Sequence, residues 1–163
     1  MQAAHPTVQR VLDAGRALGL TLTVVQFPDG TRTAVDAAAA VGCDVGQIVK
    51  SLAFAVDGEV VMAYVSGRNQ LDESKLAAAA GGSTCERVDA RRVRDVTGYA
   101  IGGVPPFGHA NNLRLFLDRD LLGYDLLWAA AGTPRDVFSI SPGELAAATG
   151  AVICDLSRDV VAN

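Results

Sequence analysis

The residue with the clearest chemical potential is a lysine in an apolar setting. Lys50 lies within residues 47–54, QIVKSLAF, whose β-branched and aromatic content predicts a buried strand. Side chains alternate along a strand, so Lys50 is expected on one face with Ile48, Leu52 and Phe54. A lysine there extends its ammonium to water, pairs with a carboxylate, or binds an anionic or polar ligand. Its position alone leaves all three interpretations open.

A loop rich in glycine and proline is the second candidate. Residues 98–108, GYAIGGVPPFG, hold four glycines and two prolines. Glycine permits positive φ and lets backbone N–H groups approach a ligand, whereas the prolines stiffen the path. Such N–H groups suit a carbonyl or an oxyanion. A rigid structural turn would show the same composition, so both interpretations stand.

Two familiar kinds of site are excluded by the neighbours of these residues. A P-loop requires glycine directly before its Lys-Ser pair, but Val49 precedes Lys50 and Ser51. A hydrolytic triad requires a histidine near its nucleophile, and only His5 and His109 are present. If the chain is an enzyme, the substrate or a water must supply the reacting group while the protein mainly positions it.

The composition sets the class of protein. The 163 residues, half of them hydrophobic, suit one domain over 1–163 with its own core. The net charge of −4 argues against broad adhesion to nucleic acid, and we expect no DNA partner. No apolar run reaches membrane length and no signal peptide is evident, so we expect a cytoplasmic protein without a membrane partner. Three cysteines without a CxxC pattern argue against disulfides and zinc, so no metal is expected: Cys43, Cys85 and Cys154.

Turn and capping signals divide the chain into alternating elements. Helices are predicted over residues 6–18, 33–41, 73–80, 89–97 and 141–149. Strands are predicted over residues 21–27, 47–56, 59–65, 84–88, 113–117, 126–131, 137–140 and 152–154. Turns are expected at residues 28–30 and at Asp57-Gly58, the strongest hairpin signal. Because strands and helices are mixed without strict βαβ alternation, the fold class is α+β with a mixed sheet.

Several sequence blocks resemble the YbaK/ProX-type aminoacyl-tRNA deacylases, which include the editing domain inserted in bacterial prolyl-tRNA synthetases. The blocks occur in the family's order from about Thr33 onward, and the lysine and the Gly-Gly-x-x-Pro-x-Gly loop are their most specific parts. They are IVKSL at 48–52, VSG at 65–67, LD at 71–72, KL at 75–76, TGY at 97–99, GGVPPFG at 102–108, Asp118, LL at 121–122 and AGTP at 131–134.

The resemblance implies a curved mixed sheet closing toward a barrel, with helices around it. It also implies trans-editing, the hydrolysis of the ester joining a wrong, small amino acid to tRNA, with tRNA(Pro) types the expected substrates. Lys50 would hold the acceptor end, and Gly102 or Gly103 would contact the aminoacyl group through its backbone. The expected substrate-binding residues are Ser51, Phe27, Ala130, Ala131 and Gly132. The expected partners are the aminoacyl-tRNA acceptor end and an aminoacyl-tRNA synthetase, with no cofactor and no covalent enzyme intermediate.

The resemblance leaves the amino acid open. Family members that act on Cys-tRNA(Pro) tend to have a serine and paired glycines where this chain has Ala130, Ala131 and Gly132, and those that act on Ala-tRNA(Pro) tend to have a histidine. Small apolar groups discriminate mainly by size. The alternative is a non-catalytic aminoacyl-tRNA or nucleotide binding module, or a synthetase-associated factor, of the same fold. The basic cluster at residues 87–94 alternates with acidic residues, which favours a solvated helix face.

Overall fold

The computed structural model describes residues 5–27 and 33–159, which form five α-helices and eight strands. The helices are α1 (Pro6–Ala17), α2 (Ala34–Val41), α3 (Glu73–Ala79), α4 (Ala90–Thr97) and α5 (Pro142–Thr149), with 3-10 turns at Val45–Gln47 and Arg119–Gly123. The strands are β1 (Val24–Gln26), β2 (Val49–Val56), β3 (Glu59–Ser66), β4 (Cys85–Arg87), β5 (Arg114–Asp118), β6 (Leu127–Ala130), β7 (Asp136–Ile140) and β8 (Val152–Cys154).

These strands form two sheets, which confirms the α+β class and changes the predicted architecture. A five-stranded mixed sheet has the order β4-β2-β3-β5-β8, and a three-stranded antiparallel sheet has the order β1-β7-β6. Only an isolated bridge between Ile48 and Trp128 joins them within the described residues. A single sheet closing toward a barrel is therefore not confirmed, because the described strands pair as two separate sheets.

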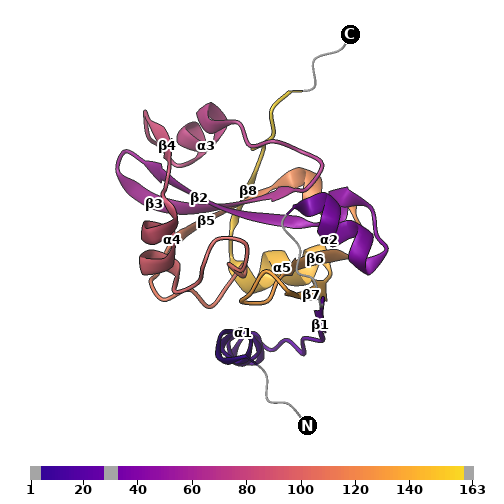
Figure 1. The fold of residues 1–163 in the computed structure, drawn as a ribbon. Coiled ribbons are helices and arrows are strands. Elements are labelled where there is room, and N and C mark those ends of the chain that lie inside the picture. The colour runs from indigo at the N-terminus through magenta and orange to yellow at the C-terminus, as the bar shows by residue number, and fades with distance from the viewer. Residues whose placement is uncertain (1–4, 28–32, 160–163) are drawn as a thin grey trace.

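The hairpin of β2 and β3 forms the centre of the larger sheet (Figure 1). Asp57 and Gly58 both have positive φ, 48° and 85°, as a two-residue hairpin turn requires. The register pairs Lys50 with Val65 and Phe54 with Val61. Almost all of β3 is buried, because it lies between β2 and β5 in the sheet. The strongest local turn signal in the sequence thus places Lys50 on β2, which pairs with the buried strand β3 along its whole length.

Local capping fixes the predicted helix boundaries. The side chains of Thr33, Asp72, Asp89 and Ser141 each accept a backbone N–H at the start of a helix. Glycines in the left-handed region end α2, α4 and α5. Strand β1 is shorter than predicted, and the turn predicted at residues 28–30 lies outside the described residues.

The core divides along the two faces of the larger sheet. One buried cluster joins α1, α4 and α5 to the smaller sheet, and a second lies beneath α3. A small third cluster holds α2 through Ala37, Ala38 and Ile48. In Figure 1, α3 and β4 lie on one side of the central hairpin and the smaller sheet lies on the other. No helix in the described residues is long and apolar enough to cross a membrane.

Candidate functional site

The site begins at an unpaired stretch of strand edge. One edge of β2 pairs with β3 along the whole length of β2. The other edge pairs with β4 only at the last three residues of β2, Phe54 to Val56. On the other side of the gap, Ile48 makes the single bridge to Trp128. Within the described residues, the second edge of β2 is therefore without a strand partner from Lys50 to Ala53. An open edge beside a buried sheet can receive a ligand.

Two cavities adjoin at this edge. The first has a volume of about 530 Å³ and the second about 550 Å³, within the range of small-molecule sites. Six residues line both cavities: Lys50, Ser51, Leu52, Ile101, Gly102 and Val104. The open stretch of β2 and the glycine loop therefore face each other where the cavities meet. The structure brings together the two features that the sequence singled out independently.

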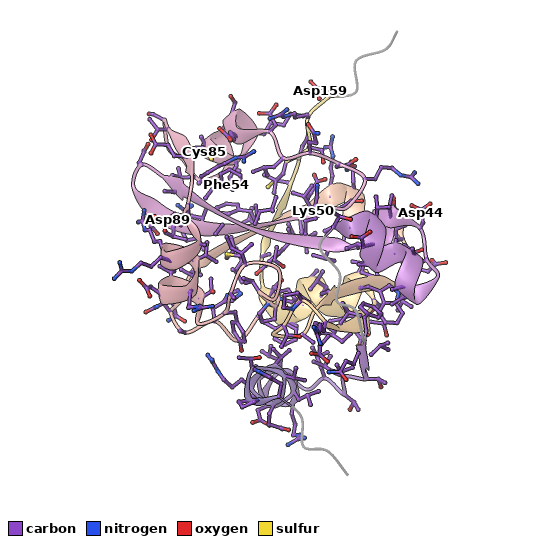
Figure 2. All side chains as sticks on the ribbon, viewed as in Figure 1. Asp44, Lys50, Phe54, Cys85, Asp89 and Asp159 are labelled. Atoms are coloured by element: carbon purple, nitrogen blue, oxygen red, sulfur yellow. The ribbon has the colours of Figure 1, made fainter. Side chains whose placement is uncertain are left out.

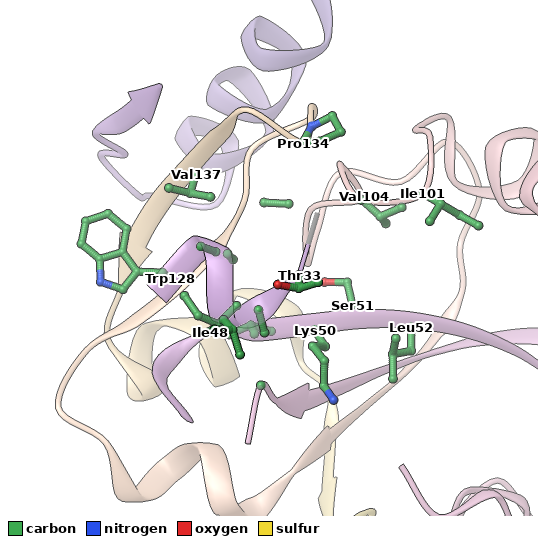
Figure 3. Close-up of a pocket in the computed structure, with 18 of the residues that line it drawn as sticks. Thr33, Ile48, Lys50, Ser51, Leu52, Ile101, Val104, Trp128, Pro134 and Val137 are labelled. Carbon is green, nitrogen blue, oxygen red and sulfur yellow. The ribbon is translucent and has the colours of Figure 1, made fainter. Parts of the chain in front are cut away.

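Lys50 is half-buried and has no carboxylate partner among the described residues. Its ammonium donates to the carbonyl oxygen of Asn69, which leaves further donors for a ligand. Burial lowers the pKa of Lys50 below its ordinary value, because desolvation disfavours the charged form. In Figure 3, Lys50 and Leu52 point to one side of β2 and Ser51 points to the other. The alternation predicted along this strand is confirmed.

The chain's other lysine shows what a structural lysine looks like in this fold. The ammonium of Lys75 lies 2.9 Å from Asp155 and 2.8 Å from Asp159, and it donates to the carbonyl of Ser157 at 2.6 Å. Hydrogen bonds to these carboxylates raise the pKa of Lys75. Lys75 therefore ties α3 to the C-terminal segment. Lys50 has the opposite pKa shift and no such partners, which is the pattern of a group placed for a ligand.

Ser51 contributes a buried hydroxyl to both cavities. Its Oγ is inaccessible to solvent and has no hydrogen-bond partner in the described residues. A buried hydroxyl without a partner costs free energy, and such groups are rare in folded proteins. Because no histidine or carboxylate hydrogen-bonds to its Oγ in the described residues, Ser51 lacks the paired base that a nucleophilic serine needs. Its hydroxyl is suited to binding a polar ligand atom.

The glycine loop is held rigidly from behind. The hydroxyl of Tyr64 donates to the carbonyl of Pro106 at 2.6 Å, and the ring of His109 lies 2.7 Å from the carbonyl of Pro105. Since a carbonyl only accepts, Nε2 of His109 donates this bond. Burial lowers the pKa of His109, so the ring favours its neutral form. His109 therefore supports the loop, in agreement with the exclusion of a triad.

The two adjacent glycines of this loop have different surroundings. Gly102 lines both cavities with φ of 90°, and its N–H has no acceptor in the described residues. Gly103 is buried; its N–H donates to Ala100 at 3.0 Å and its carbonyl accepts from Gly132 at 3.0 Å. Of the two glycines predicted to contact the aminoacyl group, only Gly102 has a free N–H beside the cavities.

We expect Gly103→Ala to act on stability. A Cβ at this position would lie 2.8 Å from Cα of Thr133 and 2.9 Å from the backbone of Gly132, too close for the strand end to tolerate without moving. Overpacking of this kind costs about 1–3 kcal/mol, or a fall in melting temperature of about 2–12 °C. Gly143→Ala is the control, because its Cβ would meet nothing within 4 Å. A normal melting curve with lost turnover would instead assign Gly103 to substrate binding.

The small residues at 130–132 also differ in their surroundings, as Gly102 and Gly103 do. Ala130 lines the first cavity, whereas Ala131 is fully buried in the core and Gly132 packs against the backbone of Thr7. Phe27 is buried and its N–H donates to Arg135 at 2.7 Å, so it extends β1 along β7 and lines neither cavity. Among these four predicted substrate-binding residues, the structure places Ala130 alone beside the open edge of β2.

Sequence reasoning missed most of the apolar wall of the first cavity. Trp128 and Val137 line this cavity from the smaller sheet (Figure 3). Ala34 and Ala37 line it from α2. The alternation of Trp128 with Ala130 on a predicted strand was the available signal. Arg87 was assigned to a solvated helix face. It lies instead on β4 opposite Phe54 and lines the second cavity.

The described residues hold no group of three or more histidine, cysteine or acidic side chains that could bind a metal ion. The chemistry of the site must therefore be sought in an ammonium, backbone N–H groups and hydroxyls. These groups bind and orient an oxygen-rich ligand.

The model of the aminoacyl-tRNA editing domain matches residues 28–148, a span that includes β2, the glycine loop and the smaller sheet. The chain belongs to this editing-domain family. The match confirms the family predicted from the lysine and glycine-loop blocks. The aligned span contains every residue of the first cavity.

Similar proteins support the same membership. A solved structure of a protein described as a candidate trans-editing enzyme for prolyl-tRNA synthetase is 47% identical, with a TM-score of 0.91, and the match covers 96% of this chain and 100% of that one. The proline–tRNA ligase of Nitratidesulfovibrio vulgaris (strain DP4) is 33% identical over 121 residues, 74% of this chain. This match spans 21% of the ligase. The uncharacterized protein YwhH of Bacillus subtilis (strain 168) is 29% identical over 122 residues, covering 75% of this chain and 78% of that protein.

Proposed function

We propose that this editing-domain protein is a trans-editing deacylase that hydrolyses the ester of a small, mischarged amino acid on tRNA, with tRNA(Pro) types as its substrates. The observation that carries the proposal is the meeting of Lys50 and Gly102 at the junction of two cavities, one largely apolar. An aminoacyl ester joins an amino acid to a nucleotide, so its carbonyl belongs at such a junction. The similarity to a protein described as a candidate trans-editing enzyme supports action apart from a synthetase.

The first cavity suits a small side chain. Its wall consists mainly of alanines with Ile48, Trp128 and Val137, and its described lining includes no histidine, aspartate, glutamate or cysteine. Apolar walls bind by size and cannot strongly reject an isostere. We therefore expect the site to accept several small amino acids and to exclude bulky ones.

The lining also limits the mechanism. With no histidine or carboxylate in the described lining of the first cavity, and with Lys50 assigned to the acceptor end, the reaction is an attack by water, assisted by groups of the substrate itself. The water oxygen bonds to the ester carbonyl carbon, the bond from that carbon to the ribose oxygen breaks, and the ribose oxygen leaves with a proton. The N–H of Gly102 is positioned to stabilise the oxyanion, and Lys50 holds the acceptor end.

A panel of mischarged tRNAs tests the proposal. tRNA(Pro) carrying alanine, serine, cysteine or a proline-sized analogue is expected to lose its amino acid faster with the protein than in buffer. Phenylalanyl- and tryptophanyl-tRNA are expected to be spared. Release of labelled amino acid at matched protein concentration measures both.

If no small amino acid in this panel is released faster than in buffer, the deacylase proposal fails. Tight binding of the same tRNAs without hydrolysis would support the alternative, a non-catalytic binding module of this fold. The lack of a histidine or carboxylate in the described lining of the first cavity is the observation that keeps this alternative in the test.

A further inference from the structure

The second cavity differs in chemistry from the first. Its wall includes apolar side chains, Leu52, Phe54, Val88 and Val93, and three cations, Lys50, Arg87 and Arg158. Glu73 is the one carboxylate among its described lining residues. A site with apolar surface and an excess of positive charge is matched by a ligand with a flat apolar part and a negative group. This local charge runs against the net charge of the whole chain, −4.

Two of the three cations, Lys50 and Arg87, project from one side of the sheet. Lys50 and Phe54 are four residues apart on β2, so their side chains project from the same face. Arg87 lies directly opposite Phe54 on β4, and cross-strand partners share a face. In Figure 2, Lys50 and Phe54 lie along the same strand, with Cys85 of β4 beside Phe54. Lys50 and Arg87 therefore lie on the same face of the sheet, and both line the second cavity together with Arg158.

Arg158 is held in place while keeping donors free. Its Nε donates to the carbonyl of Leu71 at 3.2 Å and its Nη1 to Oε1 of Gln70 at 3.1 Å. Its own N–H donates to the carbonyl of Gln70 at 2.8 Å. A guanidinium has five N–H donors, so the rest of the fork remains available for a ligand.

Neither arginine is neutralised within the described residues. Arg158 forms no ion pair there, and the side chain of Arg87 forms neither an ion pair nor a hydrogen bond. By contrast, Arg68 donates to both carboxylate oxygens of Asp44, at 2.7 and 2.8 Å. Unpaired guanidinium groups beside an apolar wall are the usual arrangement for phosphate recognition.

We propose that the second cavity binds a phosphate-bearing nucleotide, with Arg87 and Arg158 on the phosphate and the base against Leu52 and Phe54. The identity of this nucleotide rests on the proposed function: it is the 3′-terminal adenosine of the tRNA, and the amino acid that it carries enters the first cavity. Lys50 then contacts a ribose or phosphate oxygen, because Lys50 lines the second cavity as well as the first. Free nucleotides share this chemistry, so the experiment separates the two sources.

The first arm measures binding without hydrolysis. Adenosine 5′-monophosphate and adenosine are titrated into the full chain and followed by methyl NMR signals. We expect the phosphate to tighten binding about tenfold, as a charge-assisted contact can. Signals of Val88 and Val93 should shift, and those of Ile48 and Val137 in the first cavity should not. Equal binding of the two ligands, or shifts confined to the first cavity, would overturn the assignment.

The second arm uses Arg87→Ala, with Arg91→Ala as its control. Arg91 is an exposed arginine on α4 that lines neither cavity. On mischarged tRNA, Arg87→Ala should raise KM about tenfold with little change in kcat, because it loses ground-state and transition-state binding alike. The slope of log KM against log salt should fall by about 0.7 for one lost phosphate contact. Arg91→Ala should change neither.

The outcomes separate this inference from the proposed deacylase activity. Hydrolysis with an unchanged KM in Arg87→Ala would leave the deacylase standing and overturn the nucleotide assignment. Loss of mononucleotide binding in Arg87→Ala, with an unchanged KM for tRNA, would assign the cavity to free nucleotides and overturn the tRNA assignment. Mononucleotide binding that depends on Arg87 in a protein that hydrolyses no aminoacyl-tRNA would support the nucleotide cavity and reject the deacylase.

Discussion

Lys50→Ala is expected to lower deacylation by roughly 30- to 1000-fold, which corresponds to the loss of about 2–4 kcal/mol of binding and positioning. Its ammonium is the only charged group that lines both cavities in the described part of the chain. The substitution removes a hydrogen bond to the 3′ end of the tRNA, and this bond also fixes the position of the ester. Lys50→Arg should recover little, because a planar fork cannot replace a point donor in a confined site.

The same substitution should hardly change the melting temperature. Burial lowers the pKa of Lys50, so its charged form is less favourable in the folded chain than in the unfolded one. The charge therefore opposes folding fully at pH values below the lowered pKa, and this cost decreases as the pH rises from the lowered pKa to the ordinary pKa of lysine. Truncation removes that cost along with the bond to Asn69. A melting curve beside steady-state kinetics separates the two effects.

Lys75→Ala is the matched control, because Lys75 is the only other lysine in the chain. Its contacts with Asp155 and Asp159 join α3 to the C-terminal segment, so its loss should lower the melting temperature and leave turnover unchanged. Normal turnover in Lys50→Ala would remove Lys50 from the mechanism and leave it a solvated lysine at a strand edge.

Much of the fold could be predicted because its signals are local. A capping side chain and the N–H that it accepts are three residues apart, as with Thr33 and Asp36. The Asp57-Gly58 turn fixes the β2–β3 register by itself. The division into two sheets had no such signal. It depends on β1 pairing with β7, with Val24 opposite Phe138, and periodicity does not specify partners so far apart.

In the candidate site, too, the residues with local sequence signals could be predicted and those placed by long-range contacts could not. Lys50 and Gly102 stood out because a lysine in an apolar run and a glycine cluster are visible within a few residues. Ala131 and Gly132 are small like Ala130, but neither lines the cavity. Strand alternation turns Ala131 to the other face, and Gly132 packs closely against α1. The sequence did not predict Arg158 as a site residue, because its position depends on the bridge between Leu71 and Ser157, which are distant in the chain.

Ala130→Leu tests whether the apolar cavity selects amino acids by size. Ala130 lies on β6 opposite Val137, and both residues line the first cavity. A leucine there extends into the space assigned to the amino-acid side chain. Since one methylene in an apolar pocket changes discrimination by on the order of 10- to 200-fold, kcat/KM for a proline-sized amino acid should fall by about that factor. Alanine should be affected less, because it leaves more of the cavity empty.

The readout is the ratio of kcat/KM values for tRNA(Pro) carrying alanine and carrying the proline-sized analogue. Ala147→Leu is the control: Ala147 is exposed on α5 and lines neither cavity, so the added volume should leave the ratio unchanged. An equal fall for both amino acids in Ala130→Leu, with a normal melting curve, would show that Ala130 does not face the side chain. The amino acid would then lie elsewhere, and the apolar wall formed by Trp128 and Val137 would need another role. A shift of the ratio toward alanine would place the side chain against β6, with the ester at the junction beside Lys50.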